Sequence, residues 1–318
     1  MFEIFIYILI FLILFLLELF YFNIAEKYKV IDHPNERSSH QILTIRGGGI
    51  IFPIAIILTL FFVKNALVLL IPAVLLIGMV SFWDDVKNVP NYIRFLIHTL
   101  AVTMLLENMN AFRLWPLWII ILTFILIIGV INAFNFMDGI NGITGIYSLV
   151  MLASLLFVNQ KFNFINKFFI IIPLIACLVF LVFNFRKKAK CFAGDVGSVS
   201  IGFWTATLLL IVIATTGDFK YILFLSVYGV DTVLTILHRL ILKQNIFKAH
   251  RMHLFQYLVN EREFPHLTVA TIYGVLQIGI NLFVLKTNYN FIVTFLIVIV
   301  PVGLGYWFFK FVAKPTYK

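Results

Sequence analysis

Three short acidic motifs stand between long apolar stretches of this sequence: the pair Asp84-Asp85, the turn that contains Asp138, and the glycine-flanked Asp195. Adjacent carboxylates repel each other unless a cation or a basic neighbour offsets their charge. Magnesium suits such motifs because it binds one or two carboxylates and completes its octahedron with phosphate oxygens and water. The motifs therefore indicate phosphoryl chemistry that depends on a hard cation, and no His/Cys pattern indicates zinc.

The segment from Phe192 to Ser198 places glycines on both sides of Asp195, before an apolar run that we predict to be helical from residue 199. Glycine lets the backbone approach a ligand closely, and the amides at a helix N-terminus attract anions. Asp195, Gly197 and Ser198 therefore predict a corner that binds metal and phosphate.

A second polar segment carries Asn135, Asp138 and Asn141 at a spacing of three residues. In a helical turn these residues would share roughly one side of the backbone. Amides and carboxylates on that side can contact a nucleobase or a sugar. The spacing favours a nucleotide or sugar contact without identifying the ligand.

The composition places this chemistry at a membrane. Hydrophobic residues make up 62% of the chain and charged residues 12%, whereas soluble domains have roughly 45–50% apolar and about 25% charged residues. Apolar runs of about 20 residues, the length needed to cross a ~30 Å hydrocarbon core, recur along the whole chain. We therefore predict an all-α polytopic membrane protein that forms a single integral membrane domain over residues 1–318.

The apolar runs predict about 11 transmembrane helices, at residues 2–22, 49–63, 66–82, 91–106, 114–134, 143–159, 167–185, 199–216, 219–238, 267–285 and 290–310. Of the 24 Lys and Arg residues, 18 lie on the side of the membrane that holds the loops after odd-numbered helices and the C-terminus. By the positive-inside rule these segments are cytoplasmic, so we expect the N-terminus outside and the C-terminus in the cytoplasm. The acidic motifs and the histidine-containing loops all open on this predicted cytoplasmic side.

In order along the chain, these motifs resemble the polyprenyl-phosphate N-acetylhexosamine-1-phosphate transferases. This family includes the peptidoglycan translocase and the enzymes that initiate O-antigen and teichoic-acid linkage lipids. The motifs that carry the resemblance are Asp-His-Pro to Arg-Ser-Ser-His at 32–40 with Gly-Gly, Asp84-Asp85 with Arg94, Asn-Ala-x-Asn-x-x-Asp-Gly at 132–139, Asn184, Phe-x-Gly-Asp-x-Gly-Ser at 192–198, Asp231-Thr232 with Arg239, and His-Arg-Met-His at 250–253. Each motif alone is weak, but seven in order over most of the chain are specific.

The resemblance implies a UDP-sugar:polyprenyl-phosphate sugar-1-phosphate transferase. Undecaprenyl phosphate would attack the sugar-linked phosphate of a UDP-sugar and release UMP, with Mg²⁺ or Mn²⁺ as cofactor. The expected location is the bacterial plasma (inner) membrane, crossed several times, with the active site in the cytoplasm. The expected partners are the UDP-sugar, undecaprenyl phosphate and membrane lipids, without nucleic acid, and a homodimer is left open.

The resemblance also implies roles for individual residues. Catalytic roles would fall to Asp84, Asp85 and Asp195, of which Asp195 and Asp85 would bind the metal. Nucleotide or sugar contacts would fall to Asn135, Asp138, Asn141, Asn184, Phe192, His250, Arg251 and His253, with Phe192 against uracil. Arg37, His40 and Asp231 form a second tier. A structural bond from Asp231 to Arg239 or to a neighbouring helix is an equal alternative for that residue, and Gly47 to Gly49 suit a tight helix entry as well as phosphate contact.

Two departures from the family pattern bear on the substrate. Asn141 stands where many members carry a second aspartate, and the histidine segment lacks three consecutive histidines. The second departure disfavours a muramyl-pentapeptide substrate and favours the branch that initiates O-antigen or related surface glycans. The sequence leaves open the sugar, the glycan pathway, the oligomeric state, and the choice between direct attack and a covalent intermediate.

A flippase or transporter of lipid-linked sugars is the alternative function from another class. Transporters place ionisable groups near the bilayer midplane, in broken helices of two related halves. The polar motifs of this chain instead gather in loops on one side, so we expect the transferase.

Overall fold

The computed structural model describes residues 2–32, 43–63, 69–246 and 250–312, which form a bundle of helices with one small hairpin. Helices are required because lipid offers no hydrogen bonds to an exposed backbone. Seven described helices are long and apolar enough to cross a membrane: α1 (Phe2–Lys27), α6 (Leu117–Met137), α7 (Ile143–Phe162), α9 (Gly194–Thr216), η3 with α10 (Phe219–Leu225 and Ser226–Ile241), α12 (His266–Lys286), and α13 with η4 (Phe291–Trp307 and Phe308–Val312). The chain is thus a multi-pass, all-α membrane protein.

Shorter helices complete the bundle. They are η1, α2 and η2 (Gly48–Ile50, Ile51–Leu58 and Thr59–Phe61), α3 (Leu70–Val86), α4 (Asn91–Asn108), α5 (Ala111–Leu114), α8 (Phe168–Asn184) and α11 (Leu254–Asn260). Each of the eleven apolar segments predicted from the sequence coincides with helix in the described part of the chain. The number of membrane crossings and their orientation remain predictions.

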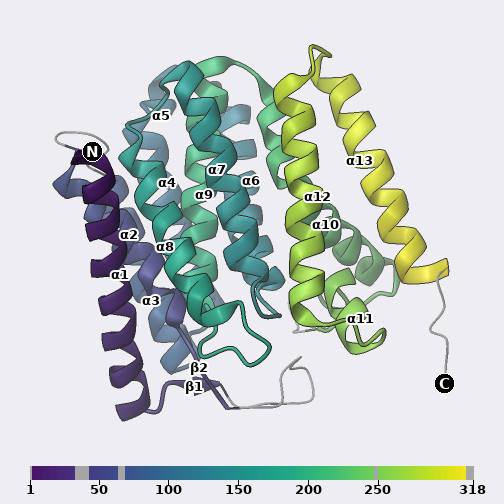
Figure 1. Ribbon diagram of the computed structural model, residues 1–318. Helices are drawn as coiled ribbons and strands as arrows, with labels where there is room; N and C mark the ends of the chain where they lie inside the picture. The colour runs from purple at the N-terminus through teal and green to yellow at the C-terminus, as the bar shows by residue number, and fades with distance from the viewer. Residues whose placement is uncertain (1, 33–42, 64–68, 247–249, 313–318) are drawn as a thin grey trace.

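Helix α9 is the centre of the bundle, packed against α3 on one side and α6 on the other (Figure 1). Nearly nine-tenths of its most apolar stretch is buried, 89% by residue count, because neighbouring helices surround it. Close packing needs small residues, and Gly202 of α9 lies against Phe134 of α6, where a β-carbon would come within 2.8 Å of the phenylalanine. The segment that begins at Asp195 is therefore held rigidly in the middle of the protein.

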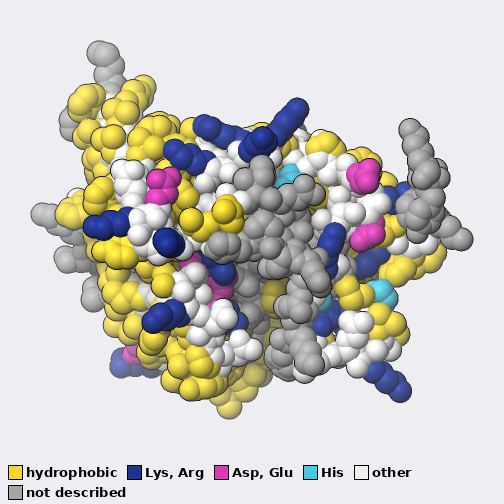
Figure 2. Space-filling view, turned by 90° about the horizontal axis from the view of Figure 1, so that it is seen from below, with side chains coloured by type: hydrophobic (Ala, Val, Ile, Leu, Met, Phe, Trp, Pro, Cys, Tyr) yellow, Lys and Arg dark blue, Asp and Glu magenta, His cyan; other side chains and the backbone are white. Residues whose placement is uncertain are grey.

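The polar loops meet at one end of this bundle. Strands β1 (Ile31–Asp32) and β2 (Thr44–Ile45) pair antiparallel at this end, which is the lower end in Figure 1. Ile45 also forms a parallel bridge with Cys191, which ties the hairpin to the loop before α9. Seen from this end, Lys and Arg side chains are spread over the surface (Figure 2), as the clustering of basic residues in alternate loops predicts.

Two predicted boundaries were wrong in a way that matters for the site. Helix α9 begins at Gly194 and not at 199, and α6 continues to Met137 and not 134. Asp195 therefore belongs to the first turn of a helix, where backbone amides lack partners within the helix. Helix propensity and hydropathy miss this turn, because its backbone amides donate hydrogen bonds to a side chain of another helix, Asp85 of α3.

Candidate active site

Helices α3 and α9 join through one carboxylate, that of Asp85. Its Oδ1 accepts a hydrogen bond from the backbone amide of Asp195 at 2.9 Å, and its Oδ2 accepts one from the amide of Val196 at 2.9 Å. Asp85 thus caps the N-terminus of α9 from outside the helix, where negative charge also suits the helix dipole. A side chain at Gly194 would prevent this, because its φ is +69° and a β-carbon would lie 2.6 Å from the Asp85 carboxylate.

Two arginines bind the three aspartates that the sequence singled out. Arg46 donates from Nε to Asp85 Oδ1 at 2.7 Å and from Nη2 to Asp195 Oδ1 at 3.4 Å. Arg94, on α4, donates from Nη1 to Asp84 Oδ2 at 2.6 Å and to Asp195 Oδ2 at 3.1 Å. The structure therefore brings the Asp84-Asp85 pair and Asp195 into one ionic cluster, although more than 100 residues separate them in sequence.

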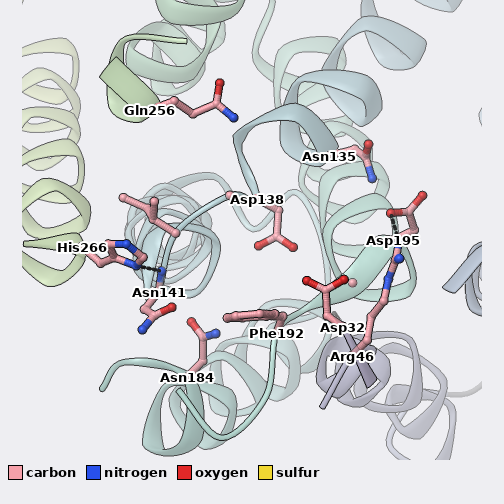
Figure 3. A pocket seen from close by; sticks show the side chains of 13 residues that line it. Asp32, Arg46, Asn135, Asp138, Asn141, Asn184, Phe192, Asp195, Gln256 and His266 are labelled. Carbon is pink, nitrogen blue, oxygen red and sulfur yellow. Dashed lines mark hydrogen bonds and ion pairs between the residues drawn. The ribbon is translucent and has the colours of Figure 1, made fainter. Parts of the chain in front are cut away.

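A pocket of about 240 Å³ opens beside this cluster. Its lining comes from the hairpin, the end of α6, the turn before α7, the start of α9 and the α11–α12 region: Asp32, Arg46, Asn135, Asp138, Gly139, Ile140, Asn141, Asn184, Phe192, Gly194, Asp195, Gln256 and His266. Figure 3 shows Arg46 and Asp195 joined at one side of the pocket and His266 with Asn141 at the other. Six predicted site residues thus meet in one cavity: Asn135, Asp138, Asn141, Asn184, Phe192 and Asp195.

Asp138 lines the pocket just after the end of α6, and its pKa is strongly shifted. Burial raises the pKa of Asp138 to about 7, and the Asp85 charge acts in the same direction. The hydroxyl of Thr144 opposes this, because it donates a hydrogen bond to Asp138 Oδ1 at 2.6 Å. A carboxyl with a pKa close to neutral in a pocket is the type of group that functional sites contain.

The asparagines of the site have different surroundings. Asn135, in the last turn of α6, donates from Nδ2 to the hydroxyl of Ser198 in α9 at 3.3 Å. Asn184 accepts from the amide of Gly142 at 2.6 Å and donates to the carbonyl of Cys191 at 2.8 Å. It therefore braces the turn before α7 against the loop before α9, which is a structural use of both of its polar atoms.

Asn141 does not share a helical face with Asn135 and Asp138, as the spacing of three residues suggested. Asn135 lies inside α6, Asp138 ends that helix, and Asn141 lies in the following turn. The side-chain Nδ2 of Asn141 donates to the carbonyl of Arg186 at 2.7 Å, and its backbone N–H donates to His266 Nδ1 at 3.4 Å. The chain reverses direction between the two helices, so helical periodicity does not apply across this segment.

His253 is buried, 1% exposed, and does not line the pocket. Its Nδ1 lies 3.1 Å from Asp231 Oδ1, and Asp231 also accepts hydrogen bonds from the Leu254 amide and the Tyr273 hydroxyl. Asp231 thus holds the start of α11 against α10 and α12. Of the two structural bonds considered for Asp231, the structure contains the one to neighbouring helices. Arg239 instead donates to the carbonyls of Asn245 and Ile246.

His250 and Arg251 lie at the surface end of the same segment. The His250 ring lies 4.9 Å from that of His253 and 6.1 Å from that of Phe136, which precedes the pocket turn. Burial, together with the neighbouring His253, lowers the pKa of His250 to about 4. Arg251 is exposed. Neither residue lines the pocket, and their contact with substrate remains a prediction; Arg37 and His40 lie outside the described residues.

Five polar residues of the site were given no role from the sequence: Asp32, Arg46, Arg94, Gln256 and His266. Asp32 and Arg94 were recognised only as parts of motifs. Arg46 directly precedes three glycines, and this position in a tight turn could have indicated that its backbone is held in place. The glycines themselves serve packing. The amides of Gly48 and Gly49 donate to the carbonyls of Phe192 and Ala193, and a β-carbon on Gly49 would lie 2.3 Å from Gly197. Gln256 and His266 carry no local signal, because only the docking of α11 and α12 brings them to the pocket.

The oxygen ligands suit a magnesium ion, although no group of three His, Cys, Asp or Glu side chains in the described residues forms a complete metal cage. Magnesium needs only one or two carboxylates when phosphates and water supply the remaining ligands. Asp85 and Asp195 share Arg46, so their carboxylates converge on one guanidinium. A cation could therefore occupy the same position with the same two carboxylates.

Residues 66–213 match the family model described as glycosyl transferase family 4. This matched part of the chain is similar to glycosyl transferase family 4. It contains the Asp84-Asp85 pair, the pocket turn and the start of α9, while the histidine segment lies outside it.

A second comparison points to the same class of protein. The chain is 32% identical over 103 residues to the phospho-N-acetylmuramoyl-pentapeptide-transferase of Thermotoga neapolitana. This match covers 31% of the present chain and 33% of the relative, so the chain spans about a third of the length of the curated relative it matches.

Proposed function

We propose that this protein transfers a sugar-1-phosphate from a UDP-sugar to undecaprenyl phosphate and releases UMP, at the cytoplasmic face of a bacterial plasma membrane. The observation that carries the proposal is the position of the Asp84, Asp85 and Asp195 cluster. A polar pocket adjoins it on one side, and exposed apolar side chains adjoin it on the other. Such a position suits a reaction between a water-soluble donor and a membrane-borne acceptor.

The pocket suits the donor. Phe192 offers an aromatic face to a base, Asp138 and the side-chain amides offer hydrogen bonds, and Arg46 offers a positive charge for a diphosphate. Burial would lower the pKa of Arg46, but the charges of Asp85 and Asp195 more than offset this and raise it. Arg46 therefore stays charged at neutral pH, and guanidinium binds phosphate oxygens in pairs.

The opposite side of the cluster suits the lipid acceptor. Asp84 and Arg94 lie beside apolar side chains that face away from the protein: Trp83 is 58% exposed, Tyr92 73% and Phe95 60%. In a membrane protein such side chains contact lipid, and aromatic residues favour the interface with water. A polyprenyl phosphate in the membrane can therefore bring its head group to Arg94 while its chain stays in the bilayer.

The chemistry is an exchange of one phosphoanhydride for another. An oxygen of the lipid phosphate forms a bond to the sugar-linked phosphorus, and the bond from that phosphorus to the UMP oxygen breaks. The reaction should therefore be nearly balanced and reversible. The arginines and the pocket orient the two phosphates, which supplies much of the catalysis in phosphoryl transfer. Magnesium, held by Asp195 and Asp85, would neutralise negative charge on the phosphates when bound.

For the sugar we propose an N-acetylhexosamine or a 6-deoxy N-acetyl sugar, as in the first step of an O-antigen or a related surface glycan. The histidine segment has two separated histidines, His250 and His253, and not three consecutive ones. This difference supports this branch over a muramyl-pentapeptide donor. Epimers and single hydroxyl groups differ little in binding free energy, so a panel of UDP-sugars is the appropriate measurement.

The test is to incubate purified protein in detergent with Mg²⁺, undecaprenyl phosphate and each UDP-sugar, and to follow UMP. We expect UMP and a lipid-linked pyrophosphate sugar in equal amounts from one donor, and loss of both with EDTA. A reaction without lipid is the control for hydrolysis. No UMP from any donor, together with movement of a lipid-linked sugar across vesicles, would replace the transferase with the flippase.

A further inference from the structure

In the described residues, N–H donors bind every carboxylate oxygen of the cluster formed by Asp84, Asp85 and Asp195. Asp85 is bound by two backbone amides and by Arg46, at 2.7 to 2.9 Å. Asp84 is bound by the Val89 amide and Arg94, both at 2.6 Å. A divalent cation binds through the lone pairs that these hydrogens approach, so the cation and the arginines compete for the same oxygens.

The charges lead to the same conclusion. When all three carboxylates are ionised, they and the two guanidinium groups leave the cluster with one net negative charge, which attracts a divalent cation weakly. Departure of one arginine side chain doubles that charge and removes a positive group that would lie beside the ion. Metal affinity should therefore depend on where the arginine side chains are.

Arg46 is the arginine that a substrate can move. Its Nη2 makes the longest contact of the cluster, 3.4 Å to Asp195, and its side chain, like that of Arg94, is 32% exposed. It lines the pocket, whereas Arg94 does not. Its backbone is fixed, because its carbonyl accepts from the Tyr21 hydroxyl at 2.6 Å and its amide donates to the Val30 carbonyl at 3.1 Å. Only the side chain can therefore move, and a diphosphate in the pocket offers it a second anionic partner.

We propose that Arg46 keeps the metal site closed until a nucleotide diphosphate draws its guanidinium away, so that cation and nucleotide bind together. This inference rests on the proposed function and adds to it an order of events. Without nucleotide, Arg46 takes the place of the cation between Asp85 and Asp195. With nucleotide, the same arginine neutralises a phosphate and frees a lone pair on Oδ1 of Asp85 and on Oδ1 of Asp195 for the cation.

The test measures binding of Mn²⁺ by the loss of the free-ion electron paramagnetic resonance signal, with and without UDP, and needs no turnover. The loss that UDP causes without protein is measured separately and subtracted. In the natural protein, UDP should tighten Mn²⁺ binding at least tenfold. Arg46→Gln should bind Mn²⁺ at least tenfold more tightly than the natural protein in the absence of UDP, and the further effect of UDP should be lost. Arg46→Lys should retain part of the effect, because it keeps the charge.

Two further variants serve as matched controls. Lys188→Gln removes one positive charge from an exposed loop and should leave Mn²⁺ binding unchanged. Arg94→Gln should tighten Mn²⁺ binding but keep the effect of UDP, because Arg46 is still present. Thermal unfolding of each variant in detergent shows whether it is folded, and an unfolded Arg46→Gln leaves Arg46→Lys to decide.

The proposal fails if UDP does not affect Mn²⁺ binding by the natural protein, or if Arg46→Gln binds Mn²⁺ like the natural protein without UDP. Release of UMP in the transferase assay would then still support the proposed function. Absence of UMP release from every donor would contradict the proposed function instead, whatever the Mn²⁺ measurement gives.

Discussion

Thr144 should control the pH at which this protein becomes active, through its hydrogen bond to Asp138. The Thr144 hydroxyl lies 2.6 Å from Asp138 Oδ1 and favours the charged carboxylate. Thr144→Val removes this donor from a buried position with little change in shape. A hydrogen bond to a charged group contributes about 1.5–3 kcal/mol, and one pKa unit corresponds to about 1.4 kcal/mol. The pKa of Asp138 should therefore rise by about 1–2 units in the variant.

The sign follows from the role of Asp138 as a carboxylate. In the natural protein, with a pKa of about 7, activity should rise as the pH passes through neutrality. In Thr144→Val this rise should move to higher pH, by about the same 1–2 units. The assay is kcat/KM for the UDP-sugar, from UMP release at saturating Mg²⁺ and lipid, over a range of pH.

Two variants test whether the shift comes from this hydrogen bond. Asp138→Asn should lose the rise altogether, because an amide does not titrate. Ser148→Ala removes a buried hydroxyl one turn further along α7 and should leave the profile unchanged. A folded Thr144→Val whose activity rises at the same pH as that of the natural protein would show that the Thr144 hydrogen bond does not set this pH dependence.

Further expectations concern four single residues. Asp195→Asn should abolish UMP release while its thermal unfolding stays close to that of the natural protein, since Asp195 lines a cleft; turnover at the natural rate would refute the assignment. Asp231→Asn should lower the free energy of unfolding by about 2–4 kcal/mol, because buried donors lose their charged acceptor, and an unchanged unfolding temperature in detergent would contradict this. Phe192→Leu should raise KM for the UDP-sugar about tenfold or more through lost stacking, with KM for the lipid unchanged as the internal control. His250→Asn should not alter the shape of the pH profile between about pH 6 and 9, because a pKa of about 4 keeps His250 neutral there.

Local composition was enough to predict the class of protein and the end of the bundle that carries the site. Long apolar runs must be helical in lipid, so the eleven segments and their polar connections follow directly from hydropathy. The acidic motifs were visible because ionisable residues beside membrane helices are costly and seldom lack a function. Pocket residues such as Asp138, Phe192 and Asp195 were found from these motifs alone.

Contacts between distant segments were decided by the tertiary structure. Arg46 and Asp195 are 149 residues apart, and no periodicity in the sequence relates them. The role of Asp85 as a cap for α9, the bracing by Asn184 and the burial of His253 against Asp231 likewise depend on which helices become neighbours. Hydropathy specifies that a helix forms and roughly where it ends, whereas the partner of a buried polar group is set by packing of the whole bundle.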